Sequence, residues 1–392
     1  MIDTADIVVI GGGVMGTSIA FHLAHRRAGR VLVLEKSFLG AGSSGKSGAI
    51  IRQHYSHPLT AGMARHGLRF FERFPELVGG PPVFTHTGLV VVAGMENRPA
   101  LEANLAMQRG LGIQVGMVSR EELRSIDPHA ALADDEIAAY ESEAGYCEAL
   151  QVVASFAEAA RRQGAEVREG VPVTGIQLDG TRITGVSTPA GTISTRTVVL
   201  ATGPWAARLS ASVGVPLPVQ PCRAQVALLR RPCEFGPPRP AYGDFRQQIY
   251  FKPTHGDMLH VGNIDPREQQ SPVDPDDYAD VADVPFAREM RRKLTDRYPA
   301  MRRAVGRGGF AALYEVTPDW HPVLDRLPGI DGGYCAAGFS GHGFKMSPAV
   351  GQLVAELVID GAARSFDIRP LRATRFSEGD LFPSTNAYSV MG

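Results

Sequence analysis

Apolar residues near the start of the chain recur in a pattern that predicts a strand, a helix and a second strand. Residues 7–10 (Ile-Val-Val-Ile) and 31–34 (Val-Leu-Val-Leu) are continuously apolar, as is typical of strands buried on both faces. Between them, residues 14–27 place Ile19 and Leu23 on one face of a helix. This order of elements predicts a βαβ unit built on a parallel sheet.

The later apolar and polar positions predict further helices and a series of short strands. Amphipathic spacing predicts helices at 58–74, 98–109, 119–125, 150–162, 284–297 and 347–360. In the last of these, Ser347 is expected to cap the helix and Pro348 to take its first position. Apolar runs between turn residues predict strands at 84–94, 166–168, 171–178, 183–188, 198–201 and 334–338.

The distribution of these elements predicts two interleaved domains and an α/β (α+β composite) fold. Helix and strand alternate in residues 1–83, 145–220 and 318–376, which we assign to a Rossmann-like nucleotide-binding domain. Residues 84–144 and 221–317 are rich in predicted strands and form a discontinuous second domain. The last residues, 377–392, are left as a C-terminal tail.

A glycine motif lies between the first strand and the first helix. Gly11 permits a tight turn, Gly13 allows a pyrophosphate to approach the backbone, and Gly16 lets the helix pack against the strand. The helix start offers free N–H groups and partial positive charge to the phosphates. Glu35 ends the second strand and can accept hydrogen bonds from a ribose diol, which favours FAD or NAD over NADP.

Composition and charge exclude several classes of function. The 392 residues are 44% apolar and 21% charged, and 40 basic against 41 acidic residues give a net charge of −1, so nucleic acid is not an expected partner. The Arg-rich stretch 288–307 is interpreted as a solvated helix face. The four cysteines form no CxxC pair and no metal site is expected. Without a basic leader or a membrane-length apolar run, the chain is expected to be cytoplasmic.

Four further segments, together with the glycine motif, resemble one known family. They are residues 48–55 (Gly-Ala-Ile-Ile-Arg-Gln-His-Tyr), 201–205 (Ala-Thr-Gly-Pro-Trp), 314–319 (Tyr-Glu-Val-Thr-Pro-Asp) and 338–345 (Gly-Phe-Ser-Gly-His-Gly-Phe-Lys). Jointly they are similar to the D-amino-acid oxidase/sarcosine oxidase family of FAD-dependent amine oxidoreductases, and most of all to sarcosine oxidases and the β subunits of the heteromeric kind. The resemblance implies one domain that holds FAD in an extended form and another that lays an antiparallel sheet over the flavin.

The resemblance also implies which residues meet the substrate. In this family a C–H bond next to an amine is oxidised at flavin N5, and the imine is then hydrolysed. Arg52 and Lys345 match the family cations that hold the substrate carboxylate, a role that suits a guanidinium fork beside an ammonium group. Tyr250 matches a tyrosine over the substrate, although a core tyrosine in a strand is an equal interpretation.

A larger set of residues is expected to contact FAD. Ser43, Ser44 and Lys46 belong to a loop near the phosphates, Val173 meets the adenine through its backbone, and the 338–345 loop stabilises negative charge on the flavin. His342 either touches the flavin or fills the turn. The complete expected set is Gly11, Gly13, Val14, Met15, Gly16, Glu35, Lys36, Ser43, Ser44, Lys46, Val173, Thr202, Gly203, Gly338, Gly341, His342, Gly343, Phe344 and Lys345.

Three departures from the family pattern bear on the chemistry. Ala312 stands where monomeric sarcosine oxidases attach flavin to a cysteine, so we expect FAD to bind without a covalent link. His260 stands where those enzymes carry a lysine that activates dioxygen, and His260 supplies a cation only when it is protonated. Ala49 replaces a basic residue. The electron acceptor, dioxygen or a carrier, is therefore left open.

The sequence thus predicts FAD-dependent oxidation of the C–N bond of a small carboxylated amine, such as sarcosine, another N-methyl amino acid, a D-amino acid or a cyclic amino acid. One alternative is a 2-hydroxy-acid dehydrogenase of the same superfamily. Another is the flavin-bearing subunit of a hetero-oligomeric amine dehydrogenase. A flavin-free NAD protein or an inactive binding module is the third.

Overall fold

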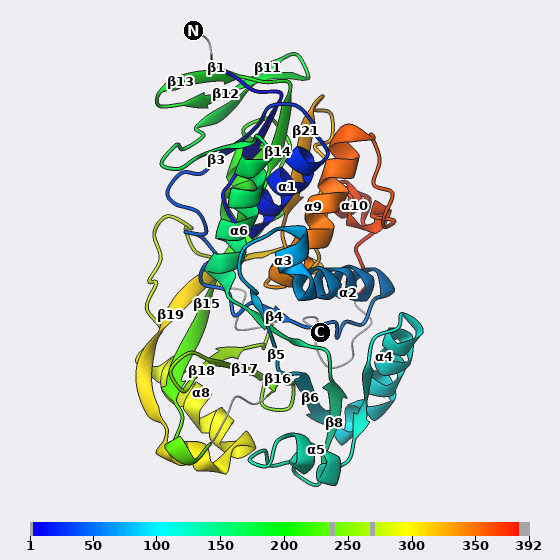
Figure 1. Ribbon diagram of the computed structural model, residues 1–392, viewed down its shortest axis with the longest axis vertical. Coiled ribbons are helices and arrows are strands. Elements are labelled where there is room, and N and C mark those ends of the chain that lie inside the picture. Colours follow the sequence, from blue (N-terminus) through cyan, green and yellow to red (C-terminus); the bar gives the residue numbers. More distant parts are fainter. Residues whose placement is uncertain (1–2, 236–239, 267–270, 384–392) are drawn as a thin grey trace.

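Two regions of sheet are stacked along the long axis of the molecule (Figure 1). The computed structural model describes residues 3–235, 240–266 and 271–383. The region at the top of Figure 1 holds the parallel sheet predicted from the first strands, flanked by helices α1, α6 and α9. The region at the bottom holds a larger sheet with helix α8 against it, and both are built from the two β-rich inserts.

The upper region is organised by a six-stranded sheet with the order β10-β3-β2-β14-β21-β20. Its strands are parallel except for the edge strand β20, which pairs antiparallel with β21. Ile7 and Val9 pack in one apolar cluster with the helices, whereas Val8 and Ile10 pack in a second cluster on the opposite face. Both faces are therefore buried, which explains the continuous apolar runs in the sequence.

The strands of this sheet are short and come from distant parts of the chain. Their bounds are β2 Ile7–Ile10, β3 Val31–Leu34, β10 Glu166–Arg168, β14 Thr197–Leu200, β20 Val323–Arg326 and β21 Gly333–Ala337. A four-stranded sheet packs on the second cluster and consists of β1 Asp3–Thr4, β11 Gly175–Asp179, β12 Arg182–Thr188 and β13 Gly191–Ser194.

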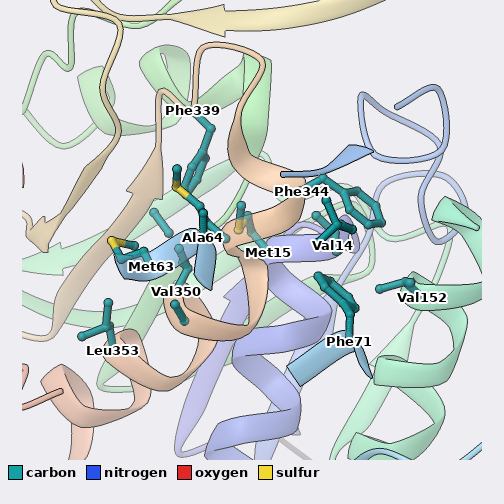
Figure 2. Packing of buried hydrophobic residues seen from close by; sticks show 14 of the residues in the cluster. Val14, Met15, Met63, Ala64, Phe71, Val152, Phe339, Phe344, Val350 and Leu353 are labelled. Carbon is teal, nitrogen blue, oxygen red and sulfur yellow. The ribbon is translucent and has the colours of Figure 1, made fainter. Parts of the chain in front are cut away.

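Helices cover the other face and pack tightly on one another. They are α1 Val14–His25, α2 Pro58–Glu72, α3 Phe74–Leu77, α6 Ala149–Arg162 and α9 Gly343–Ile359. Figure 2 shows Val14 and Met15 of α1 beside Phe344 and Val350 of α9. A side chain at Gly351 would overlap Ser18 Oγ, and that hydroxyl donates to the Ser347 carbonyl at 2.7 Å.

The lower region is an eight-stranded sheet with the order β19-β15-β18-β17-β16-β6-β8-β7. All neighbours in it are antiparallel except β16 and β6. Its strands are β6 Leu89–Gly94, β7 Val115–Val118, β8 Glu136–Glu141, β15 Gln220–Arg230, β16 Ala241–Asp244, β17 Ile249–Thr254, β18 Met258–Asn263 and β19 Val305–Val316. Helix α8, Val284–Arg297, packs on the face that points away from the upper region.

The remaining elements connect the two regions or lie at their edges. A three-stranded sheet, β4 Ile50–Ile51, β9 Gly145–Cys147 and β5 Phe84–His86, joins the first insert to the upper region. The other helices are α4 Arg98–Gly110, α5 Arg120–Ile126, α7 Ala206–Ala211 and α10 Arg375–Glu378. The structure thus confirms the predicted α/β composite with a discontinuous lower sheet.

Most predicted helices are confirmed, but the start of the last one is wrong. The helix begins at Gly343 rather than Ser347, and Pro348 lies inside it. Ser347 therefore caps nothing, and its hydroxyl is buried without a partner among the described residues. The physical reason is burial, because Phe344 and Met346 pack into the upper core and extend the helix back toward the glycine turn. The strand predicted from residue 171 also begins later, at Gly175.

A buried ionic network holds the lower region together. The Arg297 guanidinium, at the end of α8, donates to both carboxylate oxygens of Glu136 at 2.9 and 3.0 Å and to Asp244 at 2.9 Å. It also donates to the Ala131 carbonyl. The Arg297 side chain is only 2% exposed, so it stabilises two carboxylates that water does not solvate.

Removal of this guanidinium should destabilise the lower region strongly. We expect Arg297→Ala to lower the free energy of unfolding by about 3–5 kcal/mol, because it leaves two buried carboxylates without a cation. Arg292→Ala is the matched control on the same helix, since its 2.8 Å ion pair with Glu289 is exposed and is worth about 0–1 kcal/mol. Urea unfolding followed by circular dichroism measures both. Equal losses in the two variants would contradict this account.

Candidate active site

One cavity of about 720 Å³ runs between the upper and lower regions. Its upper wall consists of the first turn of α1, the ends of β3 and β14 and the first turn of α9. Its lower wall consists of residues from β15, β16, β17 and β19. The cavity lies at the carboxyl ends of the parallel strands, where open α/β sheets bind their ligands.

The glycine motif shapes the upper end of this cavity. Gly11 has a φ of +110°, which a side chain would strain. A Cβ at Gly13 would lie 3.0 Å from Ser44 Oγ, and the same hydroxyl accepts the Val14 N–H at 2.9 Å. Gly16 does not line the cavity, since it packs against the Gly11 carbonyl. The motif therefore forms a backbone-lined hollow at the start of a helix, as a pyrophosphate requires.

Glu35 lies at the end of β3, on the cavity wall. Its two carboxylate oxygens accept the N–H groups of Gly12 at 2.7 Å and Ser37 at 2.9 Å. These bonds fix the carboxylate beside the glycine turn. A carboxylate held at this place can also accept hydrogen bonds from a ribose diol.

Residues 43–46 cross from the upper region to the lower sheet. Ser43 Oγ donates to the Leu313 carbonyl at 2.7 Å, and Lys46 Nζ donates to the Ala311 carbonyl at 3.0 Å. Lys46 also donates to the Tyr278 hydroxyl at 3.2 Å. The loop thus ties the two walls together close to the predicted phosphate site, and Lys46 brings a positive charge to the cavity wall.

A segment of the second insert closes over the far end of the cavity. Asp276 accepts hydrogen bonds from Lys36 Nζ at 2.6 Å, Trp205 Nε1 at 2.9 Å and the Arg208 guanidinium at 2.6 Å. Arg208 also pairs with Asp274 at 2.7 Å. The sequence predicted Lys36 as a cofactor ligand but did not predict its ion pair with Asp276, because the partners of Asp276 lie far from it in sequence.

Two cations meet at the opposite end, and both lie over the Tyr55 ring. The Arg52 guanidinium carbon is 4.3 Å and Lys345 Nζ is 5.8 Å from the ring centroid. Lys345 Nζ donates to the His342 carbonyl at 3.1 Å, and Arg52 donates to the His54 carbonyl. Burial, together with the Arg52 charge, holds the pKa of Lys345 well below its usual value. The structure therefore brings together the two residues predicted to bind a carboxylate.

Glu141 is an acid beside this pair that no motif in the sequence selects. Its carboxylate accepts the Gln53 N–H at 2.8 and 3.1 Å and Gln53 Nε2 at 3.1 Å. Burial raises the pKa of Glu141 to about 7, against the opposing effects of Gln53 and the Arg52 charge. The only signal in the sequence is an acidic residue at the end of a strand, which is usually a solvated position.

Tyr250 lines the cavity, but His260 does not. The Tyr250 hydroxyl lies 3.3 Å from His260 Nε2, and a Cβ at Gly48 would lie 3.5 Å from the same nitrogen. Burial and the Lys252 charge lower the pKa of His260 to about 3, so the imidazole is neutral at physiological pH. His260 therefore lies against the Tyr250 hydroxyl and outside the cavity lining, and its predicted part in the chemistry stays a prediction.

The 338–345 loop leads into α9, and the first residues of that helix line the cavity. Gly341 has a φ of +81° and packs against the Tyr314 ring. His342 is 3% exposed, and both of its ring nitrogens lack a partner among the described residues. Burial is the main cause that lowers the pKa of His342 well below its usual value, so this imidazole is neutral as well. Gly338 turns the loop at a φ of +73° but does not line the cavity.

Most of the residues predicted from sequence lie on one continuous surface. The predicted residues that line the cavity are Gly11, Gly13, Val14, Met15, Glu35, Lys36, Ser43, Ser44, Lys46, Arg52, Val173, Thr202, Gly203, Tyr250, Gly341, His342, Gly343, Phe344 and Lys345. None of the four cysteines lines it. Across the ranges that the structure describes, no cluster of His, Cys, Asp and Glu could hold a metal ion. Within the same ranges no helix is long and apolar enough to cross a membrane.

Comparison with known proteins shows which family the chain is similar to. A family model described as "DAO: FAD dependent oxidoreductase" matches residues 6–357. Human peroxisomal sarcosine oxidase is 31% identical over 95% of the chain and 97% of its own length. Sarcosine oxidase subunit beta from Arthrobacter sp is 26% identical over 98% of the chain and 94% of its own length. The crystal structure of L-proline dehydrogenase from P. horikoshii has a TM-score of 0.89 at 28% identity, covering 97% of this chain and 100% of that one.

Proposed function

The chain belongs to this family of FAD-dependent oxidoreductases, and we propose that it oxidises the C–N bond of a small amine that carries a carboxylate. It is an enzyme of amine or amino-acid oxidation, and its cofactor is FAD. The observation that carries the finer proposal is the meeting of Arg52 and Lys345 in the cavity.

The cavity fits FAD in shape and in chemistry. The glycine hollow and the start of α1 would hold the pyrophosphate, Glu35 the adenosine ribose, and the start of α9 the flavin pyrimidine edge. When bound, FAD supplies the acceptor for the hydride that leaves the substrate carbon. Cysteines are missing from the cavity lining, which supports our proposal that FAD is held without a covalent bond.

The charges at the substrate end favour a carboxylate. Arg52 carries a positive charge, and a bound carboxylate would favour the charged form of Lys345, whose pKa is lowered by burial and by the Arg52 charge. Glu141 is an acid close enough to interact with both. A substrate carboxylate would neutralise the excess positive charge of Arg52 and Lys345, and the two donors would fix its orientation. The same positive field disfavours an ammonium ion, so the amine would bind in its neutral form, with its nitrogen lone pair available.

The surroundings of this pair limit what the rest of the substrate can be. Apolar side chains line the cavity near the two cations, among them Ile50, Phe245 and Ile264. Tyr250 and Tyr314 complete this wall. Such a lining accepts an N-methyl group, a small side chain or a saturated ring, and it offers little to a second charged group. We therefore propose a small secondary or cyclic amino acid as the substrate.

A direct test is a substrate screen without dioxygen. We expect sarcosine, a cyclic amino acid or another small N-alkyl amino acid to bleach the flavin absorbance of the purified enzyme, because hydride transfer reduces the ring. Acid precipitation of the same sample should release the flavin into the supernatant, since nothing attaches it. Bleaching by 2-hydroxy acids alone would replace this proposal with 2-hydroxy-acid dehydrogenation, and a colourless protein would contradict both.

Substitution of either cation should weaken recognition of the carboxylate. We expect Lys345→Met and Arg52→Gln each to lower kcat/KM by about ten- to a hundredfold, as loss of one charge-assisted hydrogen bond predicts. An amine without a carboxylate should show no such loss, because it makes no use of the pair. Lys293→Met, a lysine of α8 outside the cavity, is the control variant. Equal losses for both kinds of amine would refute the assignment.

A second candidate function concerns the electron acceptor. His260 is neutral and lies behind Tyr250, so it offers no positive charge to a developing superoxide ion. Lys252 keeps its ammonium over the Tyr146 ring at 3.9 Å, away from the cavity lining. We propose that electrons pass to a carrier, and the similarity to a protein named as a dehydrogenase supports this acceptor.

The acceptor can be identified by comparing two rates. We expect the enzyme to reduce an artificial dye at least about tenfold faster than it forms peroxide, which corresponds to about 1.4 kcal/mol in activation free energy. His260→Lys should raise the rate with dioxygen, because it places a cation behind Tyr250. Peroxide formation by the wild-type monomer at the rate of dye reduction would eliminate the carrier.

A further inference from the structure

Two polar oxygen atoms of residues that line the cavity have no hydrogen-bond partner in the part of the chain that the structure describes. They are Thr202 Oγ1, just after β14, and Glu315 Oε2, near the end of β19. Both residues line the cavity, and both atoms are inaccessible to solvent. A buried polar atom without a partner destabilises the protein, because it has lost its hydrogen bonds to water. A ligand that supplied hydrogen bonds to both atoms would offset that loss.

The surroundings of Glu315 fix the direction of its carboxylate. The Glu315 carbonyl accepts the Ser340 N–H at 3.0 Å, which ties β19 to the 338–345 loop. The backbone N–H groups of Gly338 and Phe339 favour the charged form of the carboxylate, while burial raises the pKa of Glu315 to about 7. A Cβ at Gly203 would lie 3.8 Å from Oε2. This oxygen therefore lies next to the turn that carries Thr202 and Gly203.

The place of Thr202 and Glu315 in the cavity indicates which part of the cofactor they would contact. The glycine hollow takes the phosphates, Glu35 takes the adenosine ribose, and the loop before α9 takes the pyrimidine edge. A carboxylate close to a hydroxyl suits a partner with several O–H donors. Between the phosphates and the flavin ring, FAD carries such a partner, the three hydroxyls of its ribityl chain.

We propose that Glu315 and Thr202 bind the ribityl hydroxyls of FAD, with Glu315 accepting and Thr202 donating or accepting. The two residues would hold the chain that links the phosphates to the flavin and so set the position of the ring above the substrate. This inference rests on the family's cofactor alone. A failure of the substrate screen would leave it untouched.

The test measures FAD affinity of the refolded or flavin-stripped enzyme by quenching of flavin fluorescence. The ligands are FAD and analogues in which one ribityl hydroxyl is replaced by hydrogen. We expect Glu315→Ala to raise the Kd for FAD by about ten- to a hundredfold, as loss of a charge-assisted hydrogen bond predicts. The wild type should bind at least one analogue more weakly than FAD, with a Kd raised by a similar factor. The Glu315→Ala variant should bind that analogue with the same Kd as FAD, because the contact is already lost.

Glu35→Gln is the matched control, since Glu35 is the acid at the ribose end of the same cavity. This variant should still lose affinity when the ribityl hydroxyl is removed, because its own contact lies elsewhere on FAD. Thermal unfolding of the apoproteins separates a contact from a folding defect. Two results would overturn the proposal. One is a Kd for FAD that does not change in Glu315→Ala, and the other is a loss of affinity for every analogue in that variant as large as in the wild type.

Discussion

The close packing of α9 against α1 is the constraint on which the site depends. Both helices begin at the cavity, and each begins directly after a glycine turn. Gly351 lets the two backbones approach, and Ser18 Oγ ties α1 to the Ser347 carbonyl on α9. One contact between segments more than 300 residues apart therefore places the dinucleotide turn and Lys345 on the same surface. It also directs two helix N-termini into one cavity, where we propose that they stabilise the negative charge of FAD.

Charge then decides what this surface can bind. Backbone N–H groups and Lys46 lie at the proposed phosphate end. Glu315 and Thr202 line the cavity wall, and Arg52 and Lys345 lie beside the neutral His342. Glu141 lies behind the two cations and is bonded to the backbone next to Arg52. It limits their repulsion without occupying the place of a substrate carboxylate. In the proposed function, these residues would recognise the substrate's acid group, and the cofactor would oxidise the neighbouring carbon.

Local patterns in the sequence were sufficient for much of this account. The apolar runs 7–10 and 31–34 and the helix 284–297 are found as predicted, because burial on both faces or on one stripe leaves a direct periodic signal. The start of α9 was misplaced since Ser347 and Pro348 imitate a helix start, whereas long-range packing of Phe344 extends the helix. Asp276, Glu141 and Glu315 were missed for a related reason. Their partners lie on other elements, and such contacts cannot be predicted from the spacing of residues along the chain.

A crystal structure of the FAD-bound enzyme with a short, unreactive carboxylate would show where the acid group of a substrate binds. We expect the ligand's carboxylate to bridge the Arg52 guanidinium and Lys345 Nζ, and its methylene carbon to lie against the flavin. A ligand bound elsewhere in the cavity, with both cations still turned toward Tyr55 and their own backbone, would contradict this expectation.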